Sequence, residues 1–165
     1  MKLNAAVAEA INRQINSEMQ ASYVYLAMAA YFDANELSGF SNWFRAHSVE
    51  ETGHAMKLYD YLVKRGARVD LQGIEAPDTN FSSPLAAVDK AVSMEAGVTQ
   101  QIHELFELAH ETKEYGTQPI MHWFLDEQNS EEDLFRGLQD QVAAAGDSRW
   151  HLLDLDRQLA TRAGS

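Results

Sequence analysis

Residues 67–83 form a connection without helical periodicity between two pairs of long amphipathic segments. The connection contains Gly73 and Pro77, and it ends at Ser83 and Pro84, a combination typical of a helix cap followed by a first-turn proline. About 17 extended residues reach about 55 Å. A helix of about 27 residues is only about 40 Å long. The connection can therefore run the whole length of a helical bundle.

Apolar residues recur at helical spacing in the four long segments and in one short segment near the C-terminus. Within each pair, the two long segments are joined by only a few turn residues, so each pair must be antiparallel. The long connection then makes the second and third helices parallel, which is the ferritin-like arrangement of a four-helix bundle. We therefore predict an all-α, ferritin-like four-helix bundle, as one domain over 1–165, with a crossover at 67–83 and a short fifth helix. The expected helices are 4–33, 41–64, 84–113, 119–145 and 148–160.

The charge of the chain limits its partners. There are 25 acidic residues against 13 lysines and arginines, which gives a formal net charge of -12. This balance argues against nucleic acid as a partner, because binding to phosphates requires a basic surface. An acidic surplus suits a protein that handles cations, although it is also common among acidic proteins in general.

The chain has no cysteine, which excludes disulfides, thiolate nucleophiles and iron–sulfur clusters. A metal site must then use carboxylates, imidazoles and neutral oxygens, which favour iron, manganese, magnesium or calcium, with zinc possible through histidine. No stretch approaches the roughly 20 apolar residues of a membrane span, and residues 1–10 lack a signal-peptide pattern. We expect no membrane partner and a cytoplasmic location, or an organelle stroma.

The second helix carries a Glu-x-x-His pair. Glu51 and His54 are spaced i, i+3, so both side chains lie on one helix face. This pair is the unit that carboxylate-bridged di-iron bundles use, because a carboxylate can bridge two metals while an imidazole terminates one of them. Most such pairs are simply solvated helix faces. The motif therefore gains weight only from residues on the other helices.

The other three long helices each supply polar side chains in an apolar context. Glu18 lies mid-way along the first helix, Glu95 lies among apolar residues of the third, and Gln128 and Glu131 are spaced i, i+3 on the fourth. Glu18 or Glu95 alone could equally be a surface glutamate. Together they predict a metal site, since buried carboxylates are costly unless they are paired or bind a cation.

At this point the chain resembles ferritins of the non-haem prokaryotic kind, over nearly its whole length. The resemblance implies that Fe(II) is oxidised by O2 or H2O2 at an intrasubunit di-iron ferroxidase centre. It also implies that 24 identical subunits form a shell in which ferric mineral is stored. The matching residues are Glu18, Tyr25, Glu50, Glu51, His54, Glu95, Glu127, Gln128 and Glu131.

The resemblance assigns roles to these positions. It implies that Glu18 and His54 are terminal ligands of the first iron, that Glu51 bridges both irons, and that Glu95 binds the second. Two further positions match residues beside the iron pair, and three match the carboxylates of a third iron site toward the inner surface of the shell. The two residues beside the iron pair are Gln128 and Tyr25, and the resemblance implies that Tyr25 forms a hydrogen bond there and donates an electron. The three carboxylates of the third site are Glu50, Glu127 and Glu131.

Three other positions qualify the resemblance. Ser130 stands where some relatives carry another carboxylate, so the third site is expected to be weaker, shifted or absent. Thr52 follows the bridging glutamate where haem-binding bacterioferritins have methionine, so we expect no haem. His47 lies one turn before Glu51 and could support the iron ligands, but the sequence does not assign it to the site.

Two alternatives remain at this point. One is a stand-alone di-iron oxidase or peroxidase without storage, which the absence of a cysteine-based electron-transfer module disfavours. The other is a non-catalytic cage subunit that nucleates mineral, which the complete set of predicted iron ligands disfavours. The preferred prediction is a ferroxidase that stores iron.

Overall fold

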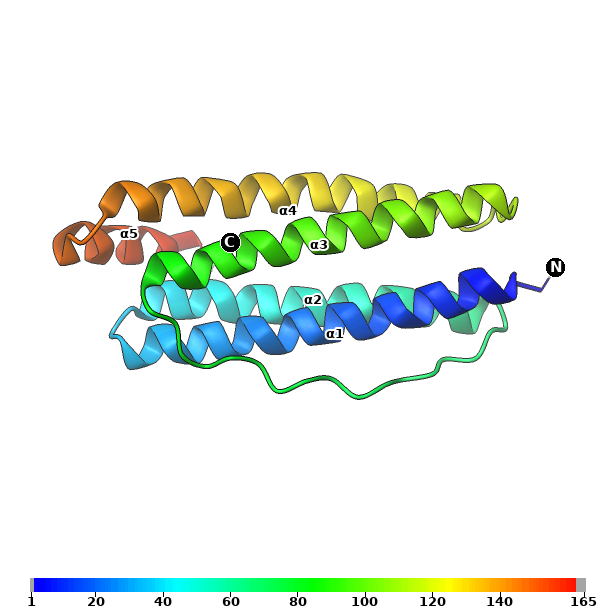
Figure 1. The fold of residues 1–165 in the computed structure, drawn as a ribbon, viewed down its shortest axis with the longest axis horizontal. Helices are drawn as coiled ribbons and strands as arrows, with labels where there is room; N and C mark the ends of the chain where they lie inside the picture. The colour runs from blue at the N-terminus through cyan, green and yellow to red at the C-terminus, as the bar shows by residue number, and fades with distance from the viewer. Residues whose placement is uncertain (1, 163–165) are drawn as a thin grey trace.

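The computed structural model describes residues 2–162, in which five α-helices follow one another (Figure 1). The all-α bundle with one long crossover and a short fifth helix confirms the predicted fold. Every helix in this part of the chain is too short or too polar to cross a membrane. The helices are α1 (Ala5–Ala34), α2 (Ser38–Lys64), α3 (Pro84–Glu111), α4 (Gln118–Ala145) and α5 (Arg149–Arg162).

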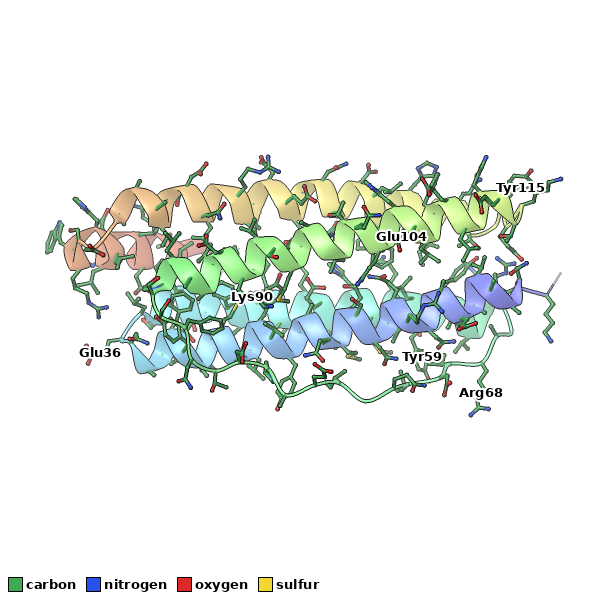
Figure 2. All side chains as sticks on the ribbon, viewed as in Figure 1. Glu36, Tyr59, Arg68, Lys90, Glu104 and Tyr115 are labelled. Carbon is green, nitrogen blue, oxygen red and sulfur yellow. The ribbon has the colours of Figure 1, made fainter. Side chains whose placement is uncertain are left out.

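The topology follows the predicted loop lengths. In Figure 1, α1 and α2 form one antiparallel pair, α3 and α4 form the other, and the crossover runs along the bundle from one end to the other. Figure 2 shows Glu36, in the α1–α2 turn, and Tyr115, in the α3–α4 turn, at opposite ends of the bundle. Helices α2 and α3 are therefore parallel, as the length of the crossover required.

The crossover is attached to α1 by a row of amide side chains at i, i+4 spacing. The Asn12 side chain accepts a hydrogen bond from the backbone N–H of residue 70 (2.8 Å) and donates one to the carbonyl of residue 68 (3.0 Å). Asn16 accepts from the N–H of residue 72, and Gln20 both accepts from and donates to the backbone of Glu75. These bonds satisfy backbone groups that an extended segment cannot pair within itself.

Local signals explain where the helices begin and end. Asn4 and Ser83 cap α1 and α3, because their side chains accept hydrogen bonds from backbone N–H groups of the first turn. Helix α3 ends two residues before the predicted 113, since Lys113 adopts a left-handed conformation (φ 56°). The N–H of Glu114 then bonds the carbonyl of Ala109, which closes the end of α3 (2.8 Å).

Helix α2 begins at Ser38, three residues before the prediction, and α5 lies against this end. The backbone N–H of Phe40, left unpaired by the helix itself, donates to the carboxylate of Asp156 on α5 (2.9 Å). A Cβ at Gly39 would lie 1.8 Å from the Asp156 carbonyl oxygen. The glycine is therefore required for the close approach of α5, and it belongs to the helix, not to the preceding turn.

The core consists of two apolar clusters with a polar layer between them. One cluster, which we call the aromatic cluster, contains Phe32, Phe40, Phe44 and Phe135 and adjoins α5. The other, the aliphatic cluster, is rich in Val, Ile and Leu from the N-terminal half of α1 and the facing helices. Each long helix passes from one cluster to the other, and the residues between them carry the candidate site.

Candidate metal centre

A layer of buried polar side chains crosses the middle of the bundle, with contributions from all four long helices. Helical spacing places Glu18 in this layer, because Ile11 and Ile15 precede it and Ala21 and Tyr25 follow it on the same buried face of α1. All members are at least nine-tenths buried. The polar layer consists of Gln14, Glu18, His47, Glu51, His54, Glu95, Gln128 and Glu131.

Three of the predicted ligands lie together, and we call them the inner group. One ligand atom each from Glu18, Glu51 and His54 lies within 4.8 Å of the other two. His54 Nδ1 lies 3.2 Å from a Glu51 carboxylate oxygen, and Gln14 donates a hydrogen bond to Glu18 Oε1 (2.9 Å). Glu18 Oε2 is buried without a hydrogen-bond partner among the described residues. The inner group thus presents a free carboxylate oxygen beside a second carboxylate and an imidazole.

The fourth predicted ligand, Glu95, is held separately. Tyr25 donates its hydroxyl hydrogen to Glu95 Oε1, and Gln128 donates to Glu95 Oε2 (3.1 Å). Gln128 also lies 3.3 Å from the hydroxyl of Thr99. In the described residues, Glu95 joins no group of three candidate ligands within 4.8 Å. Each oxygen therefore accepts one hydrogen bond, and these bonds orient the carboxylate while a second lone pair on each oxygen remains for a metal.

Burial raises the pKa values of the carboxyl groups throughout the polar layer. The pKa of Glu51 rises to about 8, first because burial removes water and then because Glu95 lies nearby. Burial, and then the proximity of Glu51, also raises the pKa of Glu18 well above its usual range. For Glu95 burial again raises the pKa, while the hydrogen bonds from Tyr25 and Gln128 partly oppose that shift. A bound cation would favour the ionised carboxylates and displace their protons.

No lysine or arginine is buried within residues 2–162. The polar layer therefore contains several carboxyl groups and only two imidazoles to balance them. Buried carboxylates are expensive without a compensating cation. This charge arrangement fits the binding of hard, multivalent cations by oxygen ligands with some imidazole.

The predicted third site is divided between two places. Glu131 lies with His47 and Glu50, whereas Glu127 lies with Glu50 and the far side of the His54 ring. His54 Nε2 is 3.7 Å from Glu127 Oε1. Across the described part of the chain, the carboxylates of Glu50, Glu127 and Glu131 do not meet as one three-ligand group. Glu50, which is exposed, is common to both arrangements.

Sequence reasoning missed residues that support the predicted ligands. Gln14 precedes Glu18 by one turn, and Thr99 follows Glu95 by one turn, so both face the layer by helical spacing. Both residues could have been found in the sequence, because each is an amide or hydroxyl side chain one helical turn from a predicted ligand. His47 was recognised by its spacing but was not assigned to the site, and the structure places it in the layer.

Residues 8–145 match the family described as "Ferritin-like domain". The bacterial non-heme ferritin of Staphylococcus saprophyticus is 37% identical over 98% of this chain and 96% of that relative. This chain belongs to the ferritin family.

Solved ferritin structures agree with this assignment. The open pore ferritin from the hyperthermophilic archaeon Archaeoglobus fulgidus is 40% identical to this ferritin, with a TM-score of 0.94 over 96% of each chain. A humanized archaeal ferritin gives a TM-score of 0.95 at 41% identity, over 96% of each chain. The family predicted from the residues alone is therefore confirmed.

Proposed function

We propose that this ferritin oxidises Fe(II) in its polar layer and stores the ferric product as mineral. The observation that supports it most is the inner group, in which Glu18, Glu51 and His54 come together in a layer without a buried lysine or arginine. Glu18 Oε2 has no other partner in the described protein. Membership of the ferritin family supports the oxidoreductase activity independently.

In the proposed mechanism iron is the substrate. Glu18 and His54 would hold the first Fe(II) ion, Glu51 would bind both ions, and Glu95 would hold the second. Two Fe(II) ions release two electrons, which reduce O2 with two protons to H2O2, or H2O2 with two protons to water. The ionised carboxylates stabilise the greater charge of Fe(III). Carboxyl groups that are protonated without metal release protons as iron enters.

Tyr25 and Gln128 are proposed to act on Glu95. Their hydrogen bonds keep its carboxylate in place without metal. The Tyr25 ring also stacks on Phe135, with ring centroids 5.4 Å apart, so the hydroxyl is held toward the layer. We further propose that Tyr25 can donate an electron to the site, as the family resemblance implies. Glu50, Glu127 and Glu131 are proposed to bind iron on the outer side of the layer.

The assembly and the cofactor are also proposals. We propose that the whole chain forms one domain, that 24 copies form the storage shell, and that the shell is cytoplasmic. We also propose that iron binds without haem. The position after the bridging glutamate carries Thr52, whose hydroxyl donates a hydrogen bond to the backbone carbonyl of Ser48 (3.1 Å).

The activity test compares matched carboxylate variants. Metal-free protein is mixed with Fe(II) in air, and ferric absorbance is followed by stopped flow. Glu51→Gln keeps the side-chain shape and should slow oxidation by at least about 100-fold, a barrier increase of about 2.7 kcal/mol. Glu107→Gln, an exposed position on α3, is the control and should oxidise at the wild-type rate. Equal rates for Glu51→Gln and wild type would reject the proposed site.

Storage requires a closed assembly, which light scattering after size-exclusion chromatography measures directly. A particle of 24 subunits that retains iron through the column supports the storage proposal. A dimer-sized particle that oxidises iron without retaining it would instead identify a stand-alone oxidase.

A further inference from the structure

His47 is held in one orientation by its surroundings. Its ring stacks at a tilt on Trp43, with centroids 3.8 Å apart, and its edge meets Phe135 at 5.0 Å. His47 Nδ1 lies 2.9 Å from the backbone carbonyl oxygen of Trp43. A carbonyl can only accept, so Nδ1 must carry the hydrogen. In the neutral ring the lone pair is therefore on Nε2, the nitrogen that faces the polar layer.

The lone pair of His47 points toward a carboxylate. Nε2 lies 3.7 Å from Glu131 Oε2, which is beyond hydrogen-bonding distance. Both atoms are buried and without a hydrogen-bond partner among residues 2–162. While Glu131 is ionised, these two acceptors face each other in a dry environment and repel unless a proton or a cation lies between them. Packing against Trp43 explains the burial of the ring, but it does not explain the unpaired nitrogen.

Glu50 completes a set of three. His47, Glu50 and Glu131, which we call the outer group, each offer one ligand atom within 4.8 Å of the other two. Glu50 is exposed while the other two residues are buried, so the group reaches solvent through Glu50. Such an arrangement gives a metal ion a route of entry and three protein ligands.

Residue 130, where some relatives carry another carboxylate, does not contribute to the outer group. Ser130 is exposed, and its hydroxyl donates to the backbone carbonyl of Asp126 on its own helix (3.1 Å). Glu127 lies beside His54 instead. The three-residue group that contains Glu131 thus offers it one imidazole, from His47, and one carboxylate, from Glu50, as co-ligands.

We propose that His47 is a direct metal ligand, and that the outer group is a mixed nitrogen–oxygen site for a divalent cation beside the proposed di-iron centre. This inference rests on the proposed function and changes the ligands of its third site. The imidazole favours borderline ions such as Zn(II) and Co(II) more than carboxylates alone do. The outer group is therefore where such ions compete with Fe(II).

Metal positions test the proposal directly. Crystals of the full-length protein are soaked in Zn(II), and anomalous difference maps locate the ions. We expect a peak about 2.0–2.1 Å from His47 Nε2, bound also by Glu131 and Glu50, in addition to peaks at the inner group. A peak among Glu50, Glu127 and Glu131 that lacks a bond to His47 would overturn it. So would an occupied inner group with no ion at His47.

Solution titrations with Co(II), without oxygen, add a second measurement. His47→Gln should bind one ion fewer per subunit, or bind it at least about 10-fold to 100-fold more weakly, while the ions at the inner group remain. The part of the visible Co(II) absorption that comes from nitrogen ligation should also decrease in His47→Gln. His103→Gln, an exposed position on α3, is the control and should titrate as wild type. An unchanged His47→Gln titration would reject the assignment.

Ser130→Glu provides a variant that leaves His47 in place. A carboxylate there should draw the outer ion away from His47 and reduce the nitrogen contribution to the Co(II) spectrum. No change in the spectrum would count against the proposal. If wild-type protein binds an ion at the inner group but none at His47, only the assignment of His47 fails. If it binds no ion at the inner group, the proposed function fails as well.

Discussion

The polar layer and the two apolar clusters on either side of it are built on the same four helices, yet they have opposite energetic roles. In the aromatic cluster, Phe32 stacks on Phe40 and Phe44 with centroids 4.8 and 5.3 Å apart. In the layer, Glu18 and Glu131 each have a buried oxygen without a partner in the described protein. The clusters stabilise the fold by burying apolar area. The layer destabilises the metal-free fold, but its unpaired carboxylate oxygens are available to bind cations.

The contrast explains how a helical bundle can accommodate an energetically costly site. The layer is short along each helix, and apolar turns flank it on both sides. The clusters therefore hold the backbone, so the ligands stay close together without metal. We expect mutations in the clusters to lower stability and spare the site, and mutations in the layer to impair metal binding without lowering the stability of the metal-free protein.

The largest effect should come from the aromatic cluster. Phe32→Ala removes a fully buried ring and should lower the free energy of unfolding by about 3–5 kcal/mol. Chemical denaturation of metal-free protein measures it. Below the unfolding transition, the variant should bind Fe(II) with wild-type stoichiometry. Loss of Fe(II) binding by folded Phe32→Ala would show that cluster and layer are not separable.

The contact between α2 and α5 should give the next largest effect. Gly39→Ala places a methyl group against the backbone of Asp156, where a flexible side chain cannot move aside, and should cost about 1–3 kcal/mol. Gly53→Ala on the same helix is the control, because a Cβ there meets no atom within 4 Å. That change should stabilise by about 0.5–1 kcal/mol. Equal thermal shifts for the two variants would contradict the role of the α5 contact.

The layer should respond in the opposite direction. Glu131→Leu removes a buried carboxyl group with an unpaired oxygen and should raise the unfolding free energy of metal-free protein by about 1–2 kcal/mol. The same variant should lose the outer metal ion. Glu107→Leu, on the exposed face of α3, should change stability by less than about 0.5 kcal/mol. Destabilisation by Glu131→Leu would mean that the layer contributes stability even without metal.

The pH dependence of stability should distinguish the layer from the clusters most finely. Burial raises the pKa values of Glu51 and Glu131 from 4.5 to about 8, so between these values the folded protein holds more protons than the unfolded chain. Metal-free stability should therefore fall as pH rises from about 4.5 to 8, by at least about 1.4 kcal/mol, the value of one pKa unit. Denaturation at several pH values measures the slope.

Two further measurements check the origin of this slope. Glu51→Gln should reduce the slope to the part that Glu131 contributes, while Phe32→Ala should lower stability equally at every pH. Saturating metal should also remove the slope, because bound cations keep the carboxylates ionised. Stability that rose with pH in metal-free protein would show that the carboxylates are stabilised in their ionised form.

Much of the fold could be read from local patterns. Helical periodicity and the loop lengths predicted the bundle, the crossover and the parallel α2 and α3, because chain length limits which ends can meet. The i, i+3 spacing of Glu51 and His54 placed them on one face, because helix geometry is local. Glu18 was predicted to join them only in combination with the polar residues of the other helices and the resemblance to ferritins. These inferences needed no knowledge of how the helices pack against one another.

The remaining features depend on contacts between elements that lie far apart in the chain. Gly39 reads as a turn residue until α5 is found against it. The separation of Glu127 from Glu131, and the pairing of Glu131 with His47, depend on the rotation and offset of α4 relative to α2. Side-chain packing across the whole bundle sets that offset, and no spacing along a single helix contains it. The identity of the inner group was therefore present in the sequence, whereas the composition of the outer group emerged from tertiary packing.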